Sequence, residues 1–502
     1  MSIAGIDDIA AKRSPLADTL SQVPAWLWLA VGLFVAMFIN GHALLNDSDT
    51  YWQIAVGQSI LDHHTFPQAD TFSFTKAGEP WISSSWLSQV LFAGAYRLAG
   101  WAGPVALAAL AIALAISLVF RTLAQRLSFA YAFLVAIAAF MLATPHFLAR
   151  PHVLVMPVIV LWARGLIAAA DEKRAPSWPL LGLMVLWANL HGSFVFGLML
   201  IAPFALETVW TTPAAQRNAM ILRWAGFGVA ALIATCATPY GWDALLAARK
   251  ILNLGQLLTV ISEWRAADFS QFGALEGCIL VLIGGALYRG ITLPPFRILF
   301  VLGLLHMALV HVRNIELFAL LAPLAVASPV AAQLGQAGGV RASMSRVSFA
   351  ACAAVVIIVA AATATLAAYR PFVPPVEQSP SEALRVLKEK KAERIFNDVM
   401  FGGYLIWKKM PVFIDGRAEL YGEKFGIDFR DARNLQNVGR LLSLLEEYRI
   451  DATLLPPSAA AVGLLDRLDG WQRVYGDDNA VIHMRMPGAV AGDTLKLKNG
   501  PR

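Results

Sequence analysis

Charged residues and cysteines are scarce in this sequence of 502 residues. Only 15% of the residues are charged, against roughly 25% in a typical soluble domain. Cys236, Cys278 and Cys352 are its cysteines, and each lies within an apolar run. The sequence therefore indicates neither a disulfide framework nor a thiolate metal site.

Patterns for binding nucleotides and nucleic acids are missing as well. Gly402-Gly403 lacks the full dinucleotide-binding or phosphate-loop pattern, and no Walker lysine follows it. The formal net charge is +6, but the basic residues are spread among hydrophobic spans and form no basic arm or patch. We also find no internal repeat of the kind that many transporters contain. Nucleotide and nucleic-acid binding are therefore disfavoured.

Hydrophobic residues, in contrast, make up 58% of the chain, and its mean hydropathy is +0.59. This composition is too apolar for a soluble protein of this size and predicts a polytopic α-helical membrane protein. A helix that crosses a bilayer needs about 20 apolar residues. Segments of this length or somewhat shorter predict about eleven membrane helices, at 25–45, 103–120, 129–148, 152–170, 178–190, 192–210, 224–238, 272–288, 296–312, 315–332 and 347–368.

Basic residues between these segments predict how the helices are oriented. Cytoplasmic loops of membrane proteins are enriched in lysine and arginine. If residues 1–24 are cytoplasmic, every inner loop is basic, with Arg121, Arg126, Lys173, Arg174, Arg217, Arg223, Arg289, Arg297, Arg341 and Arg346. The same alternation places loops 46–103 and 240–271 and the tail outside. In a bacterium this is the periplasmic side of the inner membrane.

A separate domain is predicted for residues 371–502, after a transmembrane domain at 25–370. Pro371, Pro374 and Pro375 form a stiff linker, and helical and strand-like patterns alternate after it. This alternation predicts a small α/β domain with a parallel sheet. One of its predicted strands, at 411–414, directly precedes the motif Asp415-Gly416-Arg417.

The first external loop, residues 46–103, is long for a mere connection between two helices. It contains Asp47 and Asp49 directly after the first apolar segment, and helical patterns at 52–61 and 86–98. The two carboxylates could act as a general base, bind a divalent cation, or do both. Alternatively, Ser48 or Asp49 could cap a helix that begins near Tyr51. The pattern alone leaves these roles open.

Several motifs give the chain a resemblance to a known family. They are Asp47-Ser48-Asp49-Thr50-Tyr51-Trp52, Asp70-Thr71-Phe72-Ser73, Arg150-Pro151-His152, Asn189-Leu190-His191-Gly192, Thr238-Pro239-Tyr240-Gly241, Phe401-Gly402-Gly403-Tyr404 and Asp415-Gly416-Arg417. With an acidic pair in the first loop and two juxtamembrane helices, the chain resembles the GT-C superfamily of membrane glycosyltransferases. Protein O-mannosyltransferases and the aminoarabinose transferases of lipid A are the nearest comparisons.

The resemblance implies a GT-C-like fold, a polyprenyl-phosphate-linked sugar as donor, inversion at the anomeric carbon and a first-loop aspartate as general base. In many relatives the acidic residues are adjacent, whereas Ser48 separates Asp47 from Asp49 here. The resemblance therefore leaves open which aspartate is the base. Members of the superfamily also differ in whether they need a metal, so a divalent cation at Asp47 and Asp49 stays open too.

A lipid-phosphate leaving group requires positive charge near the outer membrane surface. Arg150, His152, His191 and Arg313 lie at predicted outer helix ends and are candidates for substrate binding. Glu263 adds a carboxylate beside an aromatic side chain that suits a sugar ring. Each has another explanation, because arginines near helix ends snorkel to the interface, membrane histidines bond to neighbouring helices, and Glu263 could support the loop.

We therefore expect an inverting glycosyltransferase in the inner membrane that moves a sugar from a polyprenyl-phosphate donor to an envelope glycan, lipid or protein. Asp415-Gly416-Arg417 is expected to bind the acceptor or to dock the tail domain onto the first loop. The alternatives are a polysaccharide polymerase or ligase, a transporter or flippase of lipid-linked glycans, and an inactive scaffold. Membrane lipids are expected partners, and nucleic acid is not.

Overall fold

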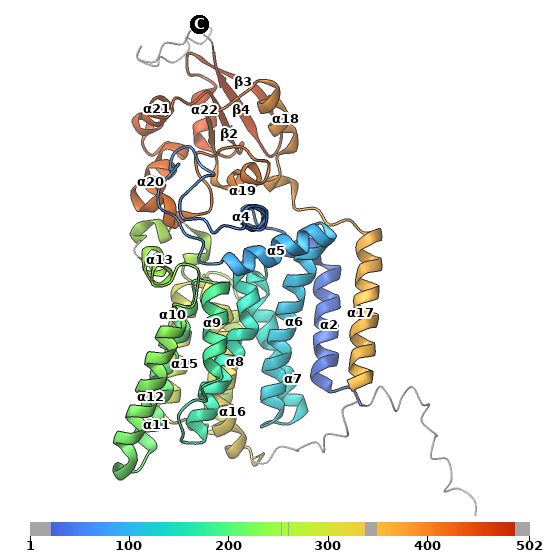
Figure 1. Cartoon of the computed structure of the whole chain (residues 1–502), viewed down its shortest axis with the longest axis vertical. Coiled ribbons are helices and arrows are strands. Elements are labelled where there is room, and N and C mark those ends of the chain that lie inside the picture. The colour runs from blue at the N-terminus through green and yellow to red at the C-terminus, as the bar shows by residue number, and fades with distance from the viewer. Residues whose placement is uncertain (1–21, 253, 260, 337–348, 487–502) are drawn as a thin grey trace, which may run out of the picture.

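The computed structural model of this chain describes residues 22–252, 254–259, 261–336 and 349–486. Helices run side by side, and a smaller domain with a sheet covers one end of them (Figure 1). In the described part, six segments are long and apolar enough to cross a bilayer: Ala102–Ala124, Phe129–His146, Pro151–Asp171, Phe194–Thr211, Val312–Gln333 and Phe349–Tyr369. The chain is thus a multi-pass membrane protein.

Each of the eleven predicted segments contains a helix. The helices that follow one another up to residue 369 are α2 (Ala25–Ile39), α3 (Gly41–Leu44), α4 (Asp49–His63), α5 (Trp86–Ala99), α6 (Ala102–Ala124), α7 (Phe129–Ala143), η1 (Thr144–His146), α8 (Pro151–Asp171), α9 (Leu180–Leu190), α10 (Phe194–Met199), α11 (Ile201–Thr211), α12 (Ala214–Ala234), α13 (Asp243–Leu252), η2 (Gly255–Thr259), η3 (Ser262–Trp264), α14 (Ala274–Arg289), α15 (Pro295–Val310), η4 (Val312–Asn314), α16 (Ile315–Gln333) and α17 (Phe349–Tyr369). Because α2, α9 and α15 are short for a membrane helix, the count of eleven spans stays a prediction.

Basic turns lie at the end of the helices opposite the smaller domain. Figure 1 shows the turn between α6 and α7 and the turn between α11 and α12 at this end. This arrangement agrees with the prediction that basic inner loops alternate with outer loops along the chain. Which side of the membrane each end faces stays a prediction. Arg341, Arg346 and residues 1–21 lie outside the described residues.

Arg297, which the sequence predicts to lie in an inner loop, has a structural role within the helix assembly. It lies in the first turn of α15, is almost fully buried, and donates to Glu207 at 2.6 Å and to Asp171 at 2.9 Å. The guanidinium thereby ties α15 to α8 and α11. A buried charge of this kind is costly unless it is paired, which explains why two carboxylates accompany it.

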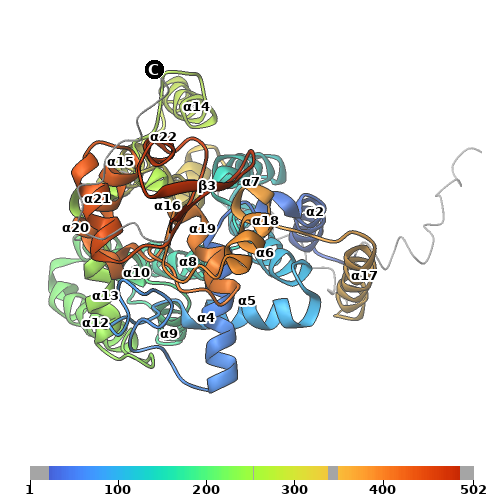
Figure 2. The ribbon, with the colours of Figure 1, turned by 90° about the horizontal axis from the view of Figure 1, so that it is seen from above.

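Alanine-rich α6 lies at the centre of the helix assembly. It packs against α2 and α8, and its small residues Ala108, Ala109 and Ala115 are completely buried. Small side chains let membrane helices approach closely and gain van der Waals contact. Seen from above, α14 and α17 lie at the edge of the assembly (Figure 2). The buried core of the membrane domain is therefore built around α6 and α8.

The two helices predicted in the first external loop are confirmed as α4 and α5. They pack against each other, and Gly57 makes the close approach possible. A Cβ atom at this glycine would lie 2.0 Å from the backbone oxygen of Gln89, so a larger residue would force the helices apart. Residues between the two helices reach upward, and Phe72 and Phe74 share backbone hydrogen bonds with Val412.

The smaller domain contains a mixed sheet, which corrects the expectation of a parallel one. Its elements are η5 (Val376–Gln378), α18 (Ser381–Glu389), β1 (Ile395–Asn397), α19 (Val399–Trp407), α20 (Ala418–Arg433), α21 (Val438–Glu447), β2 (Ala452–Leu455), α22 (Ala460–Leu465), β3 (Trp471–Gly476) and β4 (Val481–Arg485). Among the described residues the strands are ordered β1-β2-β4-β3, with β1 and β2 parallel and the other pairs antiparallel. A short turn joins β3 to β4, and only antiparallel strands can be connected in this way.

The predicted strand at 411–414 is also wrong. Val412 forms an isolated bridge with Ser73 of the first loop and does not join the sheet. The side chain of Asn397 donates to the Ile414 carbonyl at 2.7 Å and accepts the Phe413 amide at 2.8 Å. These backbone groups are satisfied without a neighbouring strand, so the segment runs between the sheet and the first loop.

A buried ion cluster fastens the smaller domain to the first loop. Arg417 donates to Asp70 at 2.6 Å and to Asp415 at 2.7 Å, and all three side chains are inaccessible to solvent. Although burial favours the neutral acid, Arg417 and the Tyr421 hydroxyl lower the pKa of Asp415. Of the two roles expected for Asp415-Gly416-Arg417, the structure shows the docking contact, and acceptor binding stays a prediction.

Candidate functional site

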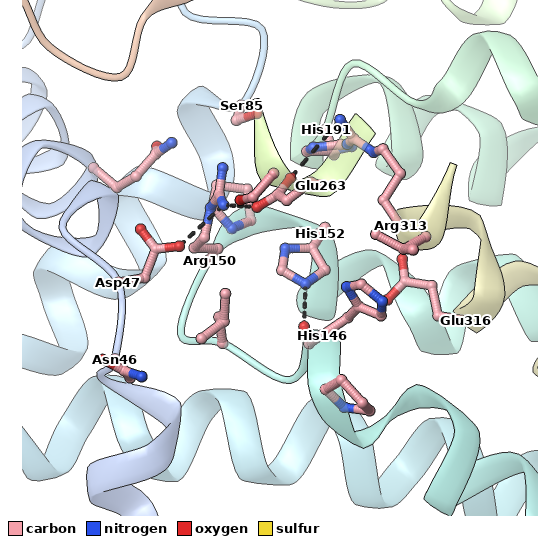
Figure 3. Close-up of a pocket in the computed structure, with 16 residues that line it drawn as sticks. Asn46, Asp47, Ser85, His146, Arg150, His152, His191, Glu263, Arg313 and Glu316 are labelled. Carbon is pink, nitrogen blue, oxygen red and sulfur yellow. Dashed lines mark hydrogen bonds and ion pairs between the residues drawn. The ribbon is translucent and has the colours of Figure 1, made fainter. Parts of the chain in front are cut away.

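A cavity of about 400 Å³ lies where the first external loop meets the upper ends of α8 and α16 (Figure 3). It is lined mainly by polar and charged residues from distant parts of the sequence. They are Asn46, Asp47, Gln53, Ser85, Pro145, His146, Leu148, Arg150, Pro151, His152, His191, Ser262, Glu263, Val312, Arg313 and Glu316. A concave site with a few convergent charged groups is the usual form of a small-molecule site.

Asp47 lines this cavity and is held from two sides. Its Oδ1 accepts the backbone amide of Asp49 at 2.7 Å, and its Oδ2 accepts a hydrogen bond from Arg150 at 3.0 Å. The amide contact serves the first turn of α4, whereas the side chain of Ser48 makes no capping bond. Ser48 thus holds the N-cap position, as one of the two alternatives from the sequence proposed, but the carboxylate that accepts the first helical amide belongs to Asp47. The same carboxylate both starts the helix and faces the cavity.

Asp49 does not line the cavity, but it contacts Arg150, which does. Its Oδ1 accepts the indole N–H of Trp52 at 2.9 Å, and its Oδ2 pairs with Arg150 at 2.9 Å. Burial raises the pKa of Asp49 to about 7, although Arg150 acts in the opposite direction. A carboxyl with this pKa would suit proton transfer near neutral pH, but Asp49 is not among the residues that line the cavity.

Arg150 organises the acidic side of the site. It precedes α8, and its guanidinium pairs with Asp47, Asp49 and Glu263. Burial opposes its charge, but these carboxylates outweigh burial and raise its pKa. Arg150 and Arg313 in turn lower the pKa of Glu263 to about 2, against the effect of burial. Because three carboxyl groups surround Arg150, its positive charge is largely compensated and attracts an anionic substrate only weakly.

Arg313 is the less neutralised cation of the cavity. Its guanidinium stacks on the Trp264 ring at 4.7 Å and lies 3.9 Å from the nearest carboxylate oxygen of Glu263, at the limit of an ion pair. Figure 3 shows Arg313 and Asp47 on opposite sides of the cavity, with Arg150 between them. The cavity thus has a carboxylate at one side and an available positive charge at the other.

The histidines of the site form hydrogen bonds with residues close to them in the sequence. His152 contacts the His146 carbonyl at 2.8 Å, and the Ser193 amide donates to Nδ1 of His191 at 3.1 Å. Burial lowers the pKa of His191 to about 3, so this imidazole is neutral at physiological pH. Neutral imidazoles can donate or accept a hydrogen bond without adding charge.

Six of the seven residues predicted for the site meet at this cavity: Asp47, Arg150, His152, His191, Glu263 and Arg313. Asp49 joins them through Arg150 only. Sequence reasoning missed His146 and Glu316, which also line the cavity. A signal for both was present, because each is an ionisable residue at the end of an apolar segment, close to Arg150 or Arg313.

The donor set does not favour a metal at the two aspartates. Within the described residues, no group of three or more histidine, cysteine, aspartate or glutamate side chains is placed to hold a metal ion. The oxygens of Asp47 and Asp49 already accept bonds from Arg150, Trp52 and a backbone amide. A divalent cation at this position would have to displace the guanidinium of Arg150.

Comparisons with known proteins leave the family open. No protein-family model and no curated protein sequence matches this chain. Among solved structures, it is similar to the apo crystal structure of the oligosaccharyltransferase from Archaeoglobus fulgidus. The match has a TM-score of 0.48 and 11% sequence identity, and it covers 87% of this chain and 69% of the archaeal one. At this level of similarity, the comparison assigns neither a family nor an activity.

Proposed function

We propose that this chain is an inverting membrane glycosyltransferase of the GT-C type. It transfers a sugar from a polyprenyl-phosphate donor to an envelope acceptor on the periplasmic face of the bacterial inner membrane. The observation that carries the proposal is the cavity in which Asp47 faces Arg313, at the end of the membrane helices covered by the smaller domain. A base and an anion site on opposite sides of a sugar are what an inverting displacement requires.

Asp47 is the general base in this proposal. A base must first lie within reach of the proton it removes, and its pKa is the second criterion. Asp47 lines the cavity, whereas Asp49, whose pKa burial raises to about 7, does not line it. The acceptor hydroxyl transfers its proton to Asp47 while its oxygen attacks the anomeric carbon. The bond from that carbon to the phosphate oxygen breaks, and the lipid phosphate leaves with the electron pair.

Arg313 holds the departing phosphate. Its charge is only weakly compensated by Glu263, and it lies across the cavity from Asp47, so attack and departure occur on opposite faces of the sugar. The stacking of its guanidinium on Trp264 fixes its direction. Arg150 keeps Asp47 and Glu263 in place. His152 and His191 can supply hydrogen bonds to the phosphate or to the sugar.

A second, mostly apolar cavity supports a lipid-linked donor. It has a volume of about 220 Å³ and shares Pro145 and Val312 with the first cavity. Its other apolar lining residues include Leu142 of α7, Leu275 of α14 and Ile315 of α16, together with Ala267 and Phe269 from the loop before α14. We place the first isoprene units of the donor there, with the phosphate at Arg313 and the sugar in the polar cavity.

The proposal is tested by removing the gene from the host bacterium and comparing envelope glycolipids, glycans and glycoproteins by mass spectrometry. We expect one sugar-bearing species to disappear, the unmodified acceptor to accumulate, and wild-type protein to restore the modification. Loss of long polymer with normal single-sugar modifications would instead point to a polymerase or ligase. An unchanged envelope in the deletion strain would contradict the proposal.

Gly416 offers a test of how the smaller domain supports the site. A Cβ at this position would lie 1.9 Å from Oδ1 of Asp49, closer than two unbonded atoms can approach. Replacing Gly416 with Ala therefore pushes Asp49 away from Arg150 and disturbs Asp47 through the shared guanidinium. We expect sugar transfer to fall by about 10- to 100-fold. The melting temperature should also fall, because displacing Asp49 weakens its buried pair with Arg150 and its bond from Trp52.

The matched control is Gly463→Ala in α22 of the same domain, where a Cβ would meet nothing within 4 Å. Transfer in membranes and melting temperature in detergent are measured for both variants. Equal transfer by the two variants would show that contact between Gly416 and Asp49 has no bearing on the reaction.

A further inference from the structure

Glu316 is an acidic side chain of the cavity that the proposed reaction leaves without a role. It lies in the first turn of α16, is only 8% exposed, and lines the cavity beside Arg313 (Figure 3). Its Oε2 atom is buried and has no hydrogen-bond partner among the described residues. Most buried polar atoms have a partner, and leaving one without a partner costs stability. Glu316 thus combines contact with the cavity and a buried oxygen that still lacks a hydrogen-bond donor.

The neighbouring cation does not satisfy Glu316. Arg313 precedes it by three residues, which places the two side chains on the same side of the helix end. The Arg313 guanidinium nevertheless stacks on Trp264 and approaches Glu263, and within the described part of the chain it forms no ion pair with Glu316. No ion pair within the described residues joins the two side chains, and both line the same cavity, so one ligand can contact both.

We infer that Glu316 accepts a hydrogen bond from a hydroxyl group of the donor's sugar. This inference rests on the proposed function. The phosphate of a lipid-linked sugar offers only acceptor oxygens, which suit Arg313, whereas the attached sugar offers hydroxyl donors within a few bonds of it. A sugar ammonium is a poorer match, because the guanidinium of Arg313 lies next to the carboxylate and would repel a second cation. Arg313 thus binds the phosphate, and Glu316 recognises the sugar attached to it.

The experiment uses the full-length protein in detergent and two probes that differ only in the sugar. These are undecaprenyl phosphate and undecaprenyl phosphate carrying a neutral hexose. Wild-type protein should bind the hexose-bearing lipid more tightly than the bare lipid phosphate. The variants are Glu316→Leu, which removes the acceptor atoms, and Glu316→Gln, which keeps the size and one acceptor oxygen. Gel filtration establishes that each variant is folded and monodisperse.

We expect Glu316→Leu to weaken binding of the hexose-bearing lipid by roughly tenfold and to leave binding of the bare lipid phosphate unchanged. Glu316→Gln should remain within about threefold of wild type for both probes, because an amide oxygen still accepts from a hydroxyl. This pattern would support the assignment, since a merely structural role of Glu316 would affect both probes alike.

Other results would overturn the assignment in distinguishable ways. If Glu316→Leu weakens both probes equally, or neither, the side chain does not contact the sugar. If Glu316→Gln binds as poorly as Glu316→Leu, the site needs a negative charge, and the hydroxyl assignment is wrong. If wild-type protein binds neither probe, the proposed donor class fails, and the role of Glu316 fails with it.

Discussion

Replacing Asp47 with Asn is expected to slow sugar transfer by about 10²- to 10⁴-fold, which is the usual contribution of a general base. The amide keeps the shape of the side chain and can still accept the backbone amide of Asp49 through its oxygen. It cannot take the proton of an acceptor hydroxyl. The protein should therefore fold and bind the donor while the reaction itself is lost.

Transfer is measured in membranes that contain equal amounts of wild-type and variant protein. Asp62→Asn is the control, because Asp62 lies near the end of α4, which Asp47 precedes, and its exposed side chain forms a surface pair with Arg97. Asp49→Asn is the informative companion, since Asp49 shares Arg150 with Asp47 without lining the cavity. Normal transfer by Asp47→Asn together with inactivity of Asp49→Asn would reverse the assignment of the base.

Replacing Arg150 with Gln is expected to abolish transfer and to lower the free energy of unfolding by about 3–5 kcal/mol, the typical cost of breaking a buried ion pair. Asp47, Asp49 and Glu263 would then face one another without a shared cation. Their mutual repulsion would spread the carboxylates apart and move Asp47 from the position that the proposed reaction needs. Arg150→Lys should recover only part of the activity, because an ammonium cannot donate along the fixed directions of a guanidinium.

Melting temperature and transfer are measured in the same preparations. Arg97→Gln is the matched control, because it breaks an exposed pair with Asp62 that contributes at most about 1 kcal/mol. A variant at position 150 that unfolds like wild type and retains transfer would show that the Arg150 cluster neither supports the site nor takes part in it.

The sequence predicted several elements correctly because their signals are local. The six candidate membrane spans of the described residues coincide with apolar segments of the sequence, and the helical patterns at 52–61 and 86–98 correspond to α4 and α5. The tail domain shows where such reasoning stops. Its alternating patterns were compatible with a parallel sheet, but strand direction depends on which strands pair, and the β3–β4 hairpin made that sheet mixed.

By itself the sequence determined that the chain lies in a membrane, where its helical segments are, and which few ionisable residues lie at helix ends. Only the tertiary structure decided which of these residues share a cavity, that Asp47 faces it while Asp49 does not, and that Glu316 belongs to it. The reason is physical. Hydrophobicity and helix periodicity are properties of neighbouring residues, whereas the bonds that build the site join Arg150 to residues 103 and 113 positions away in the chain. Such contacts exist only once the helices have packed.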